Sequence, residues 1–375
     1  MLLRHTMNEN ERIILNMIVE NPFLSQEDLA ERCGLSRPML ATYIGQLTRK
    51  GFRIGRANIV AKQGRCICIG GAAIDRKYRL AGPMVPGTSN PAAGHTTFGG
   101  VARNVCENLV RLGGHTTLLA VVGDDASGHA LVEYMKNCGT DTSRIKFATG
   151  APTAEYVAIL DGESNLGVGI FDASVADFLD VAYLQCNTSL IASTDWVFVD
   201  CNISADVLAW LVREARQYSC RLVFDTVSIS KAQRLRGHLH DVEVLFTNQD
   251  EAVVLLPDGT QDLTIPDLAA ALVRNGVRVA VITEGARGLT VADAEGVRRI
   301  EAVSTDVVDV TGAGDALVAA TLTALMEGAD VNAACRHGVA AAAMTIGCRE
   351  SVYPDLNRES LDLFMKKNLL SEQVR

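Results

Sequence analysis

The segment "STDVVDVTGAGDALVAATLTALMEG", residues 304–328, joins an acidic, β-branched run to an apolar helical stretch through a glycine turn. The run carries Asp306 and Asp309, the turn is Gly312-Ala313-Gly314, and Asp315 follows it directly. Glycines at the first turn of a helix bring bare backbone N–H groups together, where the helix dipole adds about half a positive charge. The segment therefore predicts an anion hole at residues 312–314.

An anion hole of this kind suits a migrating phosphoryl group, because fixed N–H donors stabilise the charge on its oxygens without reorganising. Asp315, at the rim of the same hole, is placed to accept the proton of an attacking hydroxyl. A structural alternative exists, since an acidic residue after a glycine turn is also a common helix cap. The segment alone leaves both interpretations open.

The chain from Arg65 onward alternates between apolar strands, such as "CRLVFDT" and "VRVAVITEG", and helical segments. This alternation predicts a three-layer α/β domain whose mostly parallel sheet is covered by helices on both faces. Such sheets bind ligands beyond the carboxyl ends of their strands, where this chain has polar, glycine-rich loops. No GxxxxGK[ST] motif is present, which excludes a P-loop.

Charge divides the chain into two parts. Residues 1–65 hold 10 Lys and Arg against 6 Asp and Glu, a net charge of +4, and the remainder holds 25 against 38, a net charge of −13. Two modules with different partners are implied. No apolar run reaches the ~18 residues of a spanning helix, and the signal-peptide pattern is missing, so we expect a cytoplasmic protein with no membrane partner.

The first module, residues 1–62, is predicted to form three helices and a short hairpin. Two helices that meet at Gly34, followed by "KGFRIGRANIV" (residues 50–60), resemble a winged helix-turn-helix domain, whose second helix enters the DNA major groove. DNA is therefore the expected partner, and a packing or dimerisation module is the alternative. The side chains expected to read DNA are Arg37, Thr42, Tyr43 and Gln46, and those expected to reach phosphates are Arg49, Lys50, Arg53 and Arg56.

The second module contains two long segments that resemble the signature regions of the PfkB (ribokinase-like) carbohydrate kinase family. They are "DVVDVTGAGDAL" (residues 306–317) and "GGVARNVCENLVRLGGHTTLLAVVGDDASG" (residues 99–128). The resemblance implies a ribokinase-like kinase domain over residues 63–375, with a small β-sheet lid formed by residues 73–100 and 153–172. It also implies ATP as the phosphoryl donor and a small sugar or nucleoside as the acceptor.

The resemblance assigns roles position by position. It makes Asp315 the catalytic base, and Gly312, Ala313 and Gly314 its anion hole. The residues implied to bind the acceptor are Asp75, Gly99, Gly100, Arg103 and Asn104. Those implied to bind ATP are Asn248, Thr283, Gly285 and Gly288. Glu251 would hold Mg²⁺ through water, and Asp309 with Thr311 would form a monovalent-cation site, which makes potassium a further expected cofactor.

The acceptor is indicated by Arg103 before Asn104, which is closer to the pseudouridine kinase branch of the family than to ribokinase. A helix-turn-helix ahead of the kinase also recurs in that branch. The resemblance therefore implies transfer to the 5′-hydroxyl of a ribosyl nucleoside, pseudouridine first, with another nucleoside or free ribose left open.

A rival function is a transcriptional regulator whose kinase-like half only senses a ligand. The presence of Asp315, an intact glycine turn and Glu251 favours catalysis, because a sensor has no need of them. The lid strands also carry apolar residues expected to be exposed, Val157, Ile159 and Val168. Exposed strands of this kind favour a symmetric homodimer over a lid covered within one chain.

Overall fold

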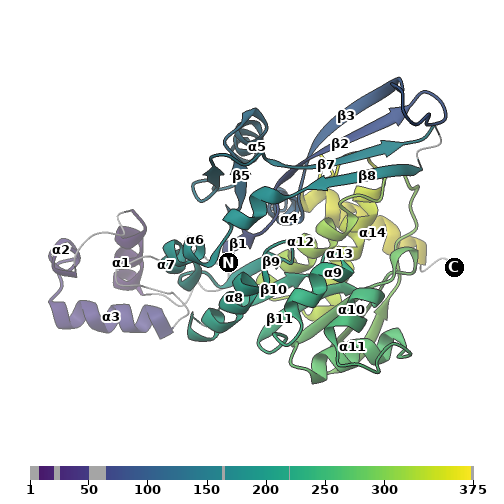
Figure 1. Ribbon diagram of the computed structural model, residues 1–375. Helices are drawn as coiled ribbons and strands as arrows, with labels where there is room; N and C mark the ends of the chain where they lie inside the picture. The colour runs from purple at the N-terminus through teal and green to yellow at the C-terminus, as the bar shows by residue number, and fades with distance from the viewer. Residues whose placement is uncertain (1–7, 21–25, 50–64, 163–164, 219, 373–375) are drawn as a thin grey trace.

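The computed structural model describes residues 8–20, 26–49, 65–162, 165–218 and 220–372. From Arg65 onward it shows a three-layer α/β domain and a smaller sheet that extends away from it (Figure 1). The predicted ribokinase-like architecture with a sheet lid is confirmed. No helix in the described part of the chain is long and apolar enough to cross a membrane.

The main sheet has eight strands in the order β14-β13-β12-β11-β10-β9-β1-β4. The strands from β12 to β4 in this order are parallel, and β13 and β14 add an antiparallel edge. The bounds are β1 (Arg65–Ile69), β4 (His115–Leu119), β9 (Trp196–Asp200), β10 (Arg221–Asp225), β11 (Val242–Asn248), β12 (Val279–Thr283), β13 (Leu289–Asp293) and β14 (Gly296–Ile300).

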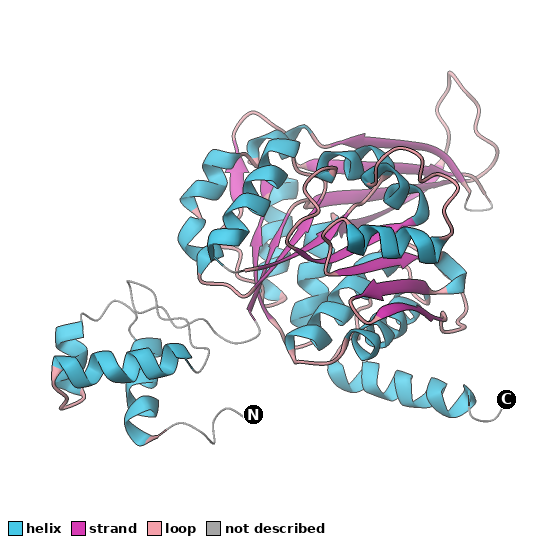
Figure 2. Cartoon of the chain, turned by 90° about the horizontal axis from the view of Figure 1, so that it is seen from below, coloured by secondary structure: helices cyan, strands magenta, loops and turns pink. Residues whose placement is uncertain are grey.

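Helices cover both faces of this sheet, as Figure 2 shows. Because successive side chains of a strand point to opposite faces, Val197 and Val199 of β9 join one apolar cluster while Phe198 joins the other. The first cluster packs against α6 (Val181–Cys186), α7 (Thr188–Ala192), α8 (Ala205–Tyr218), α9 (Ile229–Ala232), α10 (Gln249–Leu255) and α11 (Ile265–Arg274). The second packs against α4 (Val101–Arg111), α5 (Ala126–Asn137), α12 (Ala313–Met326) and α13 (Val331–Ile346), with α14 (Arg358–Glu372) outside them.

The smaller sheet has the order β3-β2-β7-β8, and a separate pair joins β5 (Val121–Gly123) to β6 (Lys146–Ala148). The four strands are β2 (Ala73–Leu80), β3 (Ala92–Gly99), β7 (Ala154–Leu160) and β8 (Leu166–Asp172). We call this sheet the lid. Its register places Asp75, Tyr156 and Phe171 side by side on one face, which we call the inner face.

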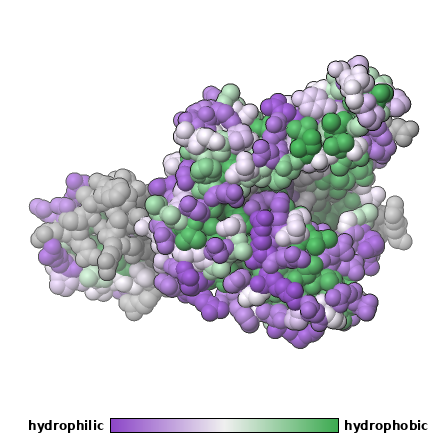
Figure 3. Space-filling view, viewed as in Figure 1, coloured by the Kyte–Doolittle hydropathy of each residue, from purple (hydrophilic) through white to green (hydrophobic). Residues whose placement is uncertain are grey.

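The opposite, outer face of the lid carries exposed apolar residues beside one ion pair, which joins Arg76 to Glu155. Val157 lies beside Ile170, and Ile159 beside Val168. Ile170 is 56% exposed and Val168 is 38% exposed, whereas Val157 and Ile159, which we expected to be exposed, are half-buried by their strand neighbours. Hydrophobic residues gather over this part of the molecule in the space-filling view (Figure 3).

The N-terminal module contributes α1 (Glu9–Glu20), α2 (Gln26–Arg32) and α3 (Arg37–Arg49), which share a small core that includes Ile14, Leu29 and Leu47. Gly34 takes a positive φ of 65° at the turn between α2 and α3. The predicted hairpin, with Lys50, Arg53 and Arg56, lies outside the described residues.

The residues expected to read DNA lie on α3. Arg37 and Thr42 are exposed and Gln46 is half-buried. Tyr43 differs from the expectation of an outward-facing side chain. Its ring packs against the core of the module, and its hydroxyl accepts a hydrogen bond from Asn10 Nδ2 at 3.0 Å.

Candidate active site

Polar residues end four neighbouring parallel strands of the main sheet. They are Asp200 of β9, Asp225 of β10, Asn248 of β11 and Thr283 of β12. Because parallel strands point the same way, these residues share one edge of the sheet, where open α/β folds bind their ligands.

Asp200 fixes the backbone at this edge. Its carboxylate accepts hydrogen bonds from the backbone N–H groups of Gly71 at 2.8 Å, Ala102 at 2.9 Å and Asn202 at 2.9 Å. A Cβ at Gly70 would collide with the same carboxylate. Burial raises the pKa of Asp200, and the three amide donors oppose that rise. The sequence analysis missed this residue, although an acid that ends a wholly apolar strand was a usable signal.

A cavity of about 520 Å³ lies between this edge and the inner face of the lid. Predicted residues from three distant parts of the chain line it, namely Asp75, Gly100, Asn104, Thr311, Gly312 and Asp315. Part of the expected acceptor set and part of the expected catalytic set thus meet in one place. The predicted residues that do not line this cavity, within the described part of the chain, are Gly99, Arg103, Ala313, Gly314, Asp309, Glu251 and the residues expected to bind ATP.

Two glycines at the start of α4 permit close packing around the cavity. A Cβ at Gly99 would collide with the carboxylate of Asp75, and one at Gly100 would meet the backbone of Gly71. Gly100 also takes a φ of 95°, which other residues rarely adopt. Gly99 therefore acts by leaving room for Asp75, which supplies the polar side chain. Burial raises the pKa of Asp75, and Arg103 and Lys77 partly offset this.

Gly312 begins α12 with a φ of 81°, and a Cβ there would collide with the carbonyl oxygen of Ser351. The amide of Ala313 donates to the carbonyl of Val310 at 3.3 Å, so this amide is engaged within the turn. Beside Gly314, no atom lies within 4 Å of where a Cβ would be. Since amides in a first helical turn point toward the N-terminus, those of Gly314 and Asp315 are the ones suited to an anion.

Asp315 itself is only 9% exposed. Asn104 Nδ2 donates a hydrogen bond to its Oδ2 at 2.6 Å. Burial raises the pKa of Asp315 to about 7, helped by the charges of Asp200 and Asp75 and opposed by Asn104 and Arg103. A carboxylate with this pKa is a proton acceptor matched to neutral solution.

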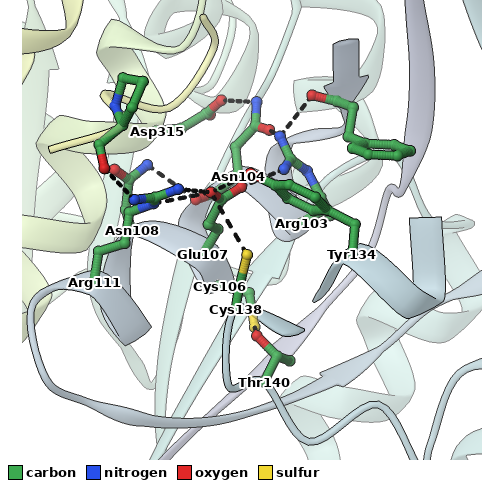
Figure 4. A network of polar contacts seen from close by, with 12 residues as sticks. Arg103, Asn104, Cys106, Glu107, Asn108, Arg111, Tyr134, Cys138, Thr140 and Asp315 are labelled. Carbon is green, nitrogen blue, oxygen red and sulfur yellow. Dashed lines mark hydrogen bonds and ion pairs between the residues drawn. The ribbon is translucent and has the colours of Figure 1, made fainter. Parts of the chain in front are cut away.

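Arg103 is the clearest correction to the predicted site (Figure 4). Its side chain is 2% exposed, and its guanidinium binds Glu107 Oε2 at 2.5 Å and the carbonyl of Phe98 at 2.6 Å. It also donates to Oδ1 of Asn104. Arg103 therefore holds the amide of Asn104, whose Nδ2 faces Asp315, and among the described residues it is not part of the cavity lining.

Glu107 anchors the far end of this network. Its other oxygen accepts hydrogen bonds from Arg111 Nη2 at 2.7 Å and from the hydroxyl of Tyr134 at 2.8 Å. Burial, followed by the charge of Glu107, raises the pKa of Tyr134 to about 12. A buried chain of contacts therefore runs from Glu107 through Arg103 and Asn104 to Asp315.

The residues expected to bind ATP follow β11 and β12 along the same edge. Asn248 caps α10 and forms a reciprocal capping box with Glu251. In the register of the sheet Asn248 lies opposite Thr283. Gly285 and Gly288 form the next turn with φ angles of 59° and 94°, and a Cβ at Gly288 would collide with the backbone of residues 300–302.

Glu251 is buried, and its carboxylate accepts hydrogen bonds from Thr226 and from Asn248 Nδ2 at 2.7 Å. Among the described residues, no cluster of three or more His, Cys, Asp or Glu side chains could hold a metal ion. This donor set fits magnesium that keeps its waters and reaches Glu251 through one of them.

The expected monovalent-cation site has a different occupant. Lys77 Nζ of β2 lies 2.5 Å from Asp309 Oδ2 and 3.0 Å from Thr311 Oγ1. These two residues, predicted to bind potassium, are already bound to a positive charge of the same chain.

Three further cavity residues were not named individually from the sequence. Tyr156 and Phe171 belong to the lid segment 153–172, where the sequence suggested base recognition, and Lys231 follows β10. The ammonium of Lys231 donates to Asn202 and lies 5.1 Å from the ring centre of Phe171. Burial lowers the pKa of Lys231, and the charge of Asp200 opposes this. No local motif marks these residues, because only the folded lid brings them together.

Comparison with known families agrees with this geometry. The profile described as pfkB family carbohydrate kinase matches residues 63–357, and the profile described as winged helix-turn-helix DNA-binding matches residues 7–52.

Among curated relatives, the sugar kinase YeiI of Escherichia coli is 28% identical, covering 90% of this chain and 94% of the relative. The pseudouridine kinase of E. coli is 29% identical, covering 78% and 93%. A carbohydrate kinase structure from Agrobacterium tumefaciens, 28% identical, superposes with a TM-score of 0.70 over 80% of this chain and 97% of that chain. Arabidopsis thaliana ribokinase complexed with ribose and ATP shares the fold at 19% identity, with a TM-score of 0.71 over 81% of this chain and 99% of that one.

The buried carboxyl group at a glycine-capped helix, the glycine-rich loops below a sheet lid and the profile match over residues 63–357 lead to one conclusion. This chain belongs to the pfkB family of carbohydrate kinases and carries a winged helix-turn-helix domain ahead of its sugar or nucleoside kinase domain.

Proposed function

We propose that the chain transfers the terminal phosphoryl group of ATP to the 5′-hydroxyl of a ribosyl nucleoside, with pseudouridine as the first candidate. The observation that carries the proposal is the position of Asp315, buried in the cavity beside Asn104, with its pKa raised to about 7. A base in this position accepts the proton of a hydroxyl that the cavity holds.

The reaction has three parts. Asp75 and Asn104 orient the acceptor through its hydroxyls, which donate to their oxygens or accept from the amide. Asp315 takes the proton as the hydroxyl oxygen bonds to the phosphorus and the bond to ADP breaks. The amides at the start of α12 stabilise the charge on the transferred oxygens. Glu251 would hold magnesium through water, and the ion would supply neutralisation of the phosphate charge.

The lining of the cavity favours a nucleoside over a free sugar. Tyr156 and Phe171 form an aromatic wall, which suits the flat face of a base. Asn202 and Lys231 place donors near this wall, and a base with carbonyl oxygens accepts from such donors. The relatives named pseudouridine kinase and, at 26% identity over 76% of this chain and 94% of the relative, the guanosine-inosine kinase of Exiguobacterium acetylicum support the same class.

ATP consumption with pseudouridine, uridine, inosine and ribose as acceptors tests this proposal. The proposal would be wrong if ribose were used best or if no nucleoside were used.

With the acceptor so identified, Asp315→Asn should lower turnover by ~10² or more, because the substitution removes the proton acceptor. Calorimetric titration should still detect binding of ATP and acceptor. In the parent, activity should rise with pH through about 7, since only the ionised carboxylate of Asp315 accepts a proton. Asp206→Asn, on the exposed start of α8, is the matched control.

The Arg103 network gives a second prediction. Arg103→Met should lower kcat by about tenfold. A loss of this size is expected when one charge-assisted hydrogen bond no longer stabilises the transition state. It should also move the rise of activity to higher pH, because the Arg103 charge lowers the pKa of Asp315. Arg111→Met is the control, since Arg111 also binds Glu107 but has no contact with Asn104 among the contacts described. An unchanged pH profile in folded Arg103→Met protein would contradict the positioning role.

We also propose that residues 1–62 bind DNA. Fluorescence anisotropy should show that affinity for duplex DNA falls by at least about tenfold between about 50 and 200 mM salt, as expected for two or more phosphate contacts. Arg37→Ala should weaken binding. A chain that begins at residue 63 should lose it and keep its kinase activity. Equal DNA affinity with and without residues 1–62 would show that DNA binds to another part of the chain.

Finally, we propose that a second copy of the chain covers the outer face of the lid. Exposed apolar strands at this density favour pairing across a symmetric interface. Light scattering should find a dimer for the parent and a monomer for Ile170→Lys, which places a charge among the exposed apolar residues of the edge strand β8. Val297→Lys, at an exposed apolar position of β14, should remain dimeric. A parent that is monomeric at every concentration excludes the interface.

A further inference from the structure

The carboxylate of Asp309, in the loop that leads to the glycine turn, is fully engaged by groups of this chain. Oδ1 accepts from the backbone N–H of Thr311 at 2.9 Å and from its hydroxyl at 2.6 Å. Oδ2 accepts from Lys77 Nζ at 2.5 Å. The same ammonium donates to Thr311 Oγ1 at 3.0 Å. One lysine therefore satisfies two oxygen atoms at once.

The contact is partly shielded from solvent. The side chains of Lys77 and Asp309 are 20% and 26% exposed, so dissolved ions screen the pair less than they would a surface pair. The ammonium of Lys77 is thus the counter-charge of the Asp309 carboxylate.

The position of Lys77 follows from the lid. Side chains two residues apart on a strand share a face, so Lys77 lies on the inner face with Asp75. On its other side the loop is held by α13, because the backbone N–H groups of Val308 and Asp309 donate to the carbonyl of Ile346 at 2.9 and 3.2 Å. The loop is therefore fixed between the lid and α13, and its last residue, Thr311, lines the cavity.

We propose that the ammonium of Lys77 is a built-in monovalent cation, which makes the chain independent of potassium. A potassium ion is held by oxygen ligands, and here it would compete for the oxygens of Asp309 and Thr311 with a lysine of equal charge. Lysine is tethered, so its local concentration does not depend on the salt in solution. Lys77, from the lid sheet, therefore takes the place of the potassium ion expected from the sequence.

The effect on catalysis, which rests on the proposed function, acts through the turn. Asp309 and Thr311 precede Gly312, whose conformation sets the first amides of α12. A cation at Asp309 keeps that loop in place. Because the cation comes from the lid, the lid and the anion hole are joined by one ion pair.

The test compares the parent with Lys77→Met, which keeps the length of the side chain and removes its charge. Melting temperatures are measured in choline, sodium and potassium chlorides at about 0.1 M, a matched ionic strength. The parent should melt at the same temperature in all three salts. Lys77→Met should melt about 2 °C or more higher in potassium chloride than in choline chloride, because an ion that binds only the folded state stabilises it. This measurement needs no substrate, so it stands even if the proposed acceptor is wrong.

Turnover with the identified acceptor is the second readout. The parent should keep the same kcat in choline and potassium, and Lys77→Met should lose about tenfold in choline and recover in potassium. Lys77→Arg should behave like the parent because it keeps the charge. Arg79→Met, which removes an exposed charge of the same strand, should also behave like the parent. A parent stabilised or activated by potassium, or a folded Lys77→Met protein that responds to no cation in either readout, would overturn the proposal.

Discussion

The carboxylate of Asp200 is the contact on which the rest of the site depends. It joins three pieces of backbone that are far apart in sequence, namely the turn after β1, the start of α4 and the turn after β9. The first piece leads into Asp75, and the second carries Asn104. Because backbone amides are obligatory donors, a buried group that satisfies three of them fixes the relative positions of the loops it joins. Asp200 contacts these loops and leaves the chemistry to the residues they carry.

Several carboxyl groups are buried close together at this edge of the sheet. Their proximity disfavours their ionised forms, which costs folding stability but gives pKa values suited to proton transfer. Burial raises the pKa of Asp225 well above its usual range, and the charge of Asp315 adds to this. The backbone after Asp225 is unusual as well, since Val227 has a φ of 65°, a region that β-branched residues avoid. Its N–H donates to Asp225 at 2.8 Å, and Val227 lines the cavity. Burial first, and then the charges of Asp200 and Asp75, raise the pKa of Asp315 toward the neutral range that a base requires.

The sequence was informative where the chemistry is local and misleading where a distant partner decides. The glycine turn and Asp315 are adjacent, so their geometry followed from helix physics alone. Arg103 and Asn104 are also adjacent, but neighbours on a helix point about 100° apart. Once Asn104 faces the cavity, Arg103 has to turn toward Glu107. Lys77 was out of reach for sequence patterns, because 232 residues separate it from Asp309 and only the folded lid brings them together.

The lid shows how one strand register serves two functions. Asp75 and Lys77 point inward to the cavity and to Asp309, while Arg76 between them faces outward, beside Val157 of the outer face. Because the side-chain period of a strand is two, a slip of one residue would turn Asp75 outward and place apolar side chains over the cavity. The same slip would break the ion pair between Lys77 and Asp309. The outer face and the polar inner face therefore cannot vary independently, because one strand register sets the residues of both.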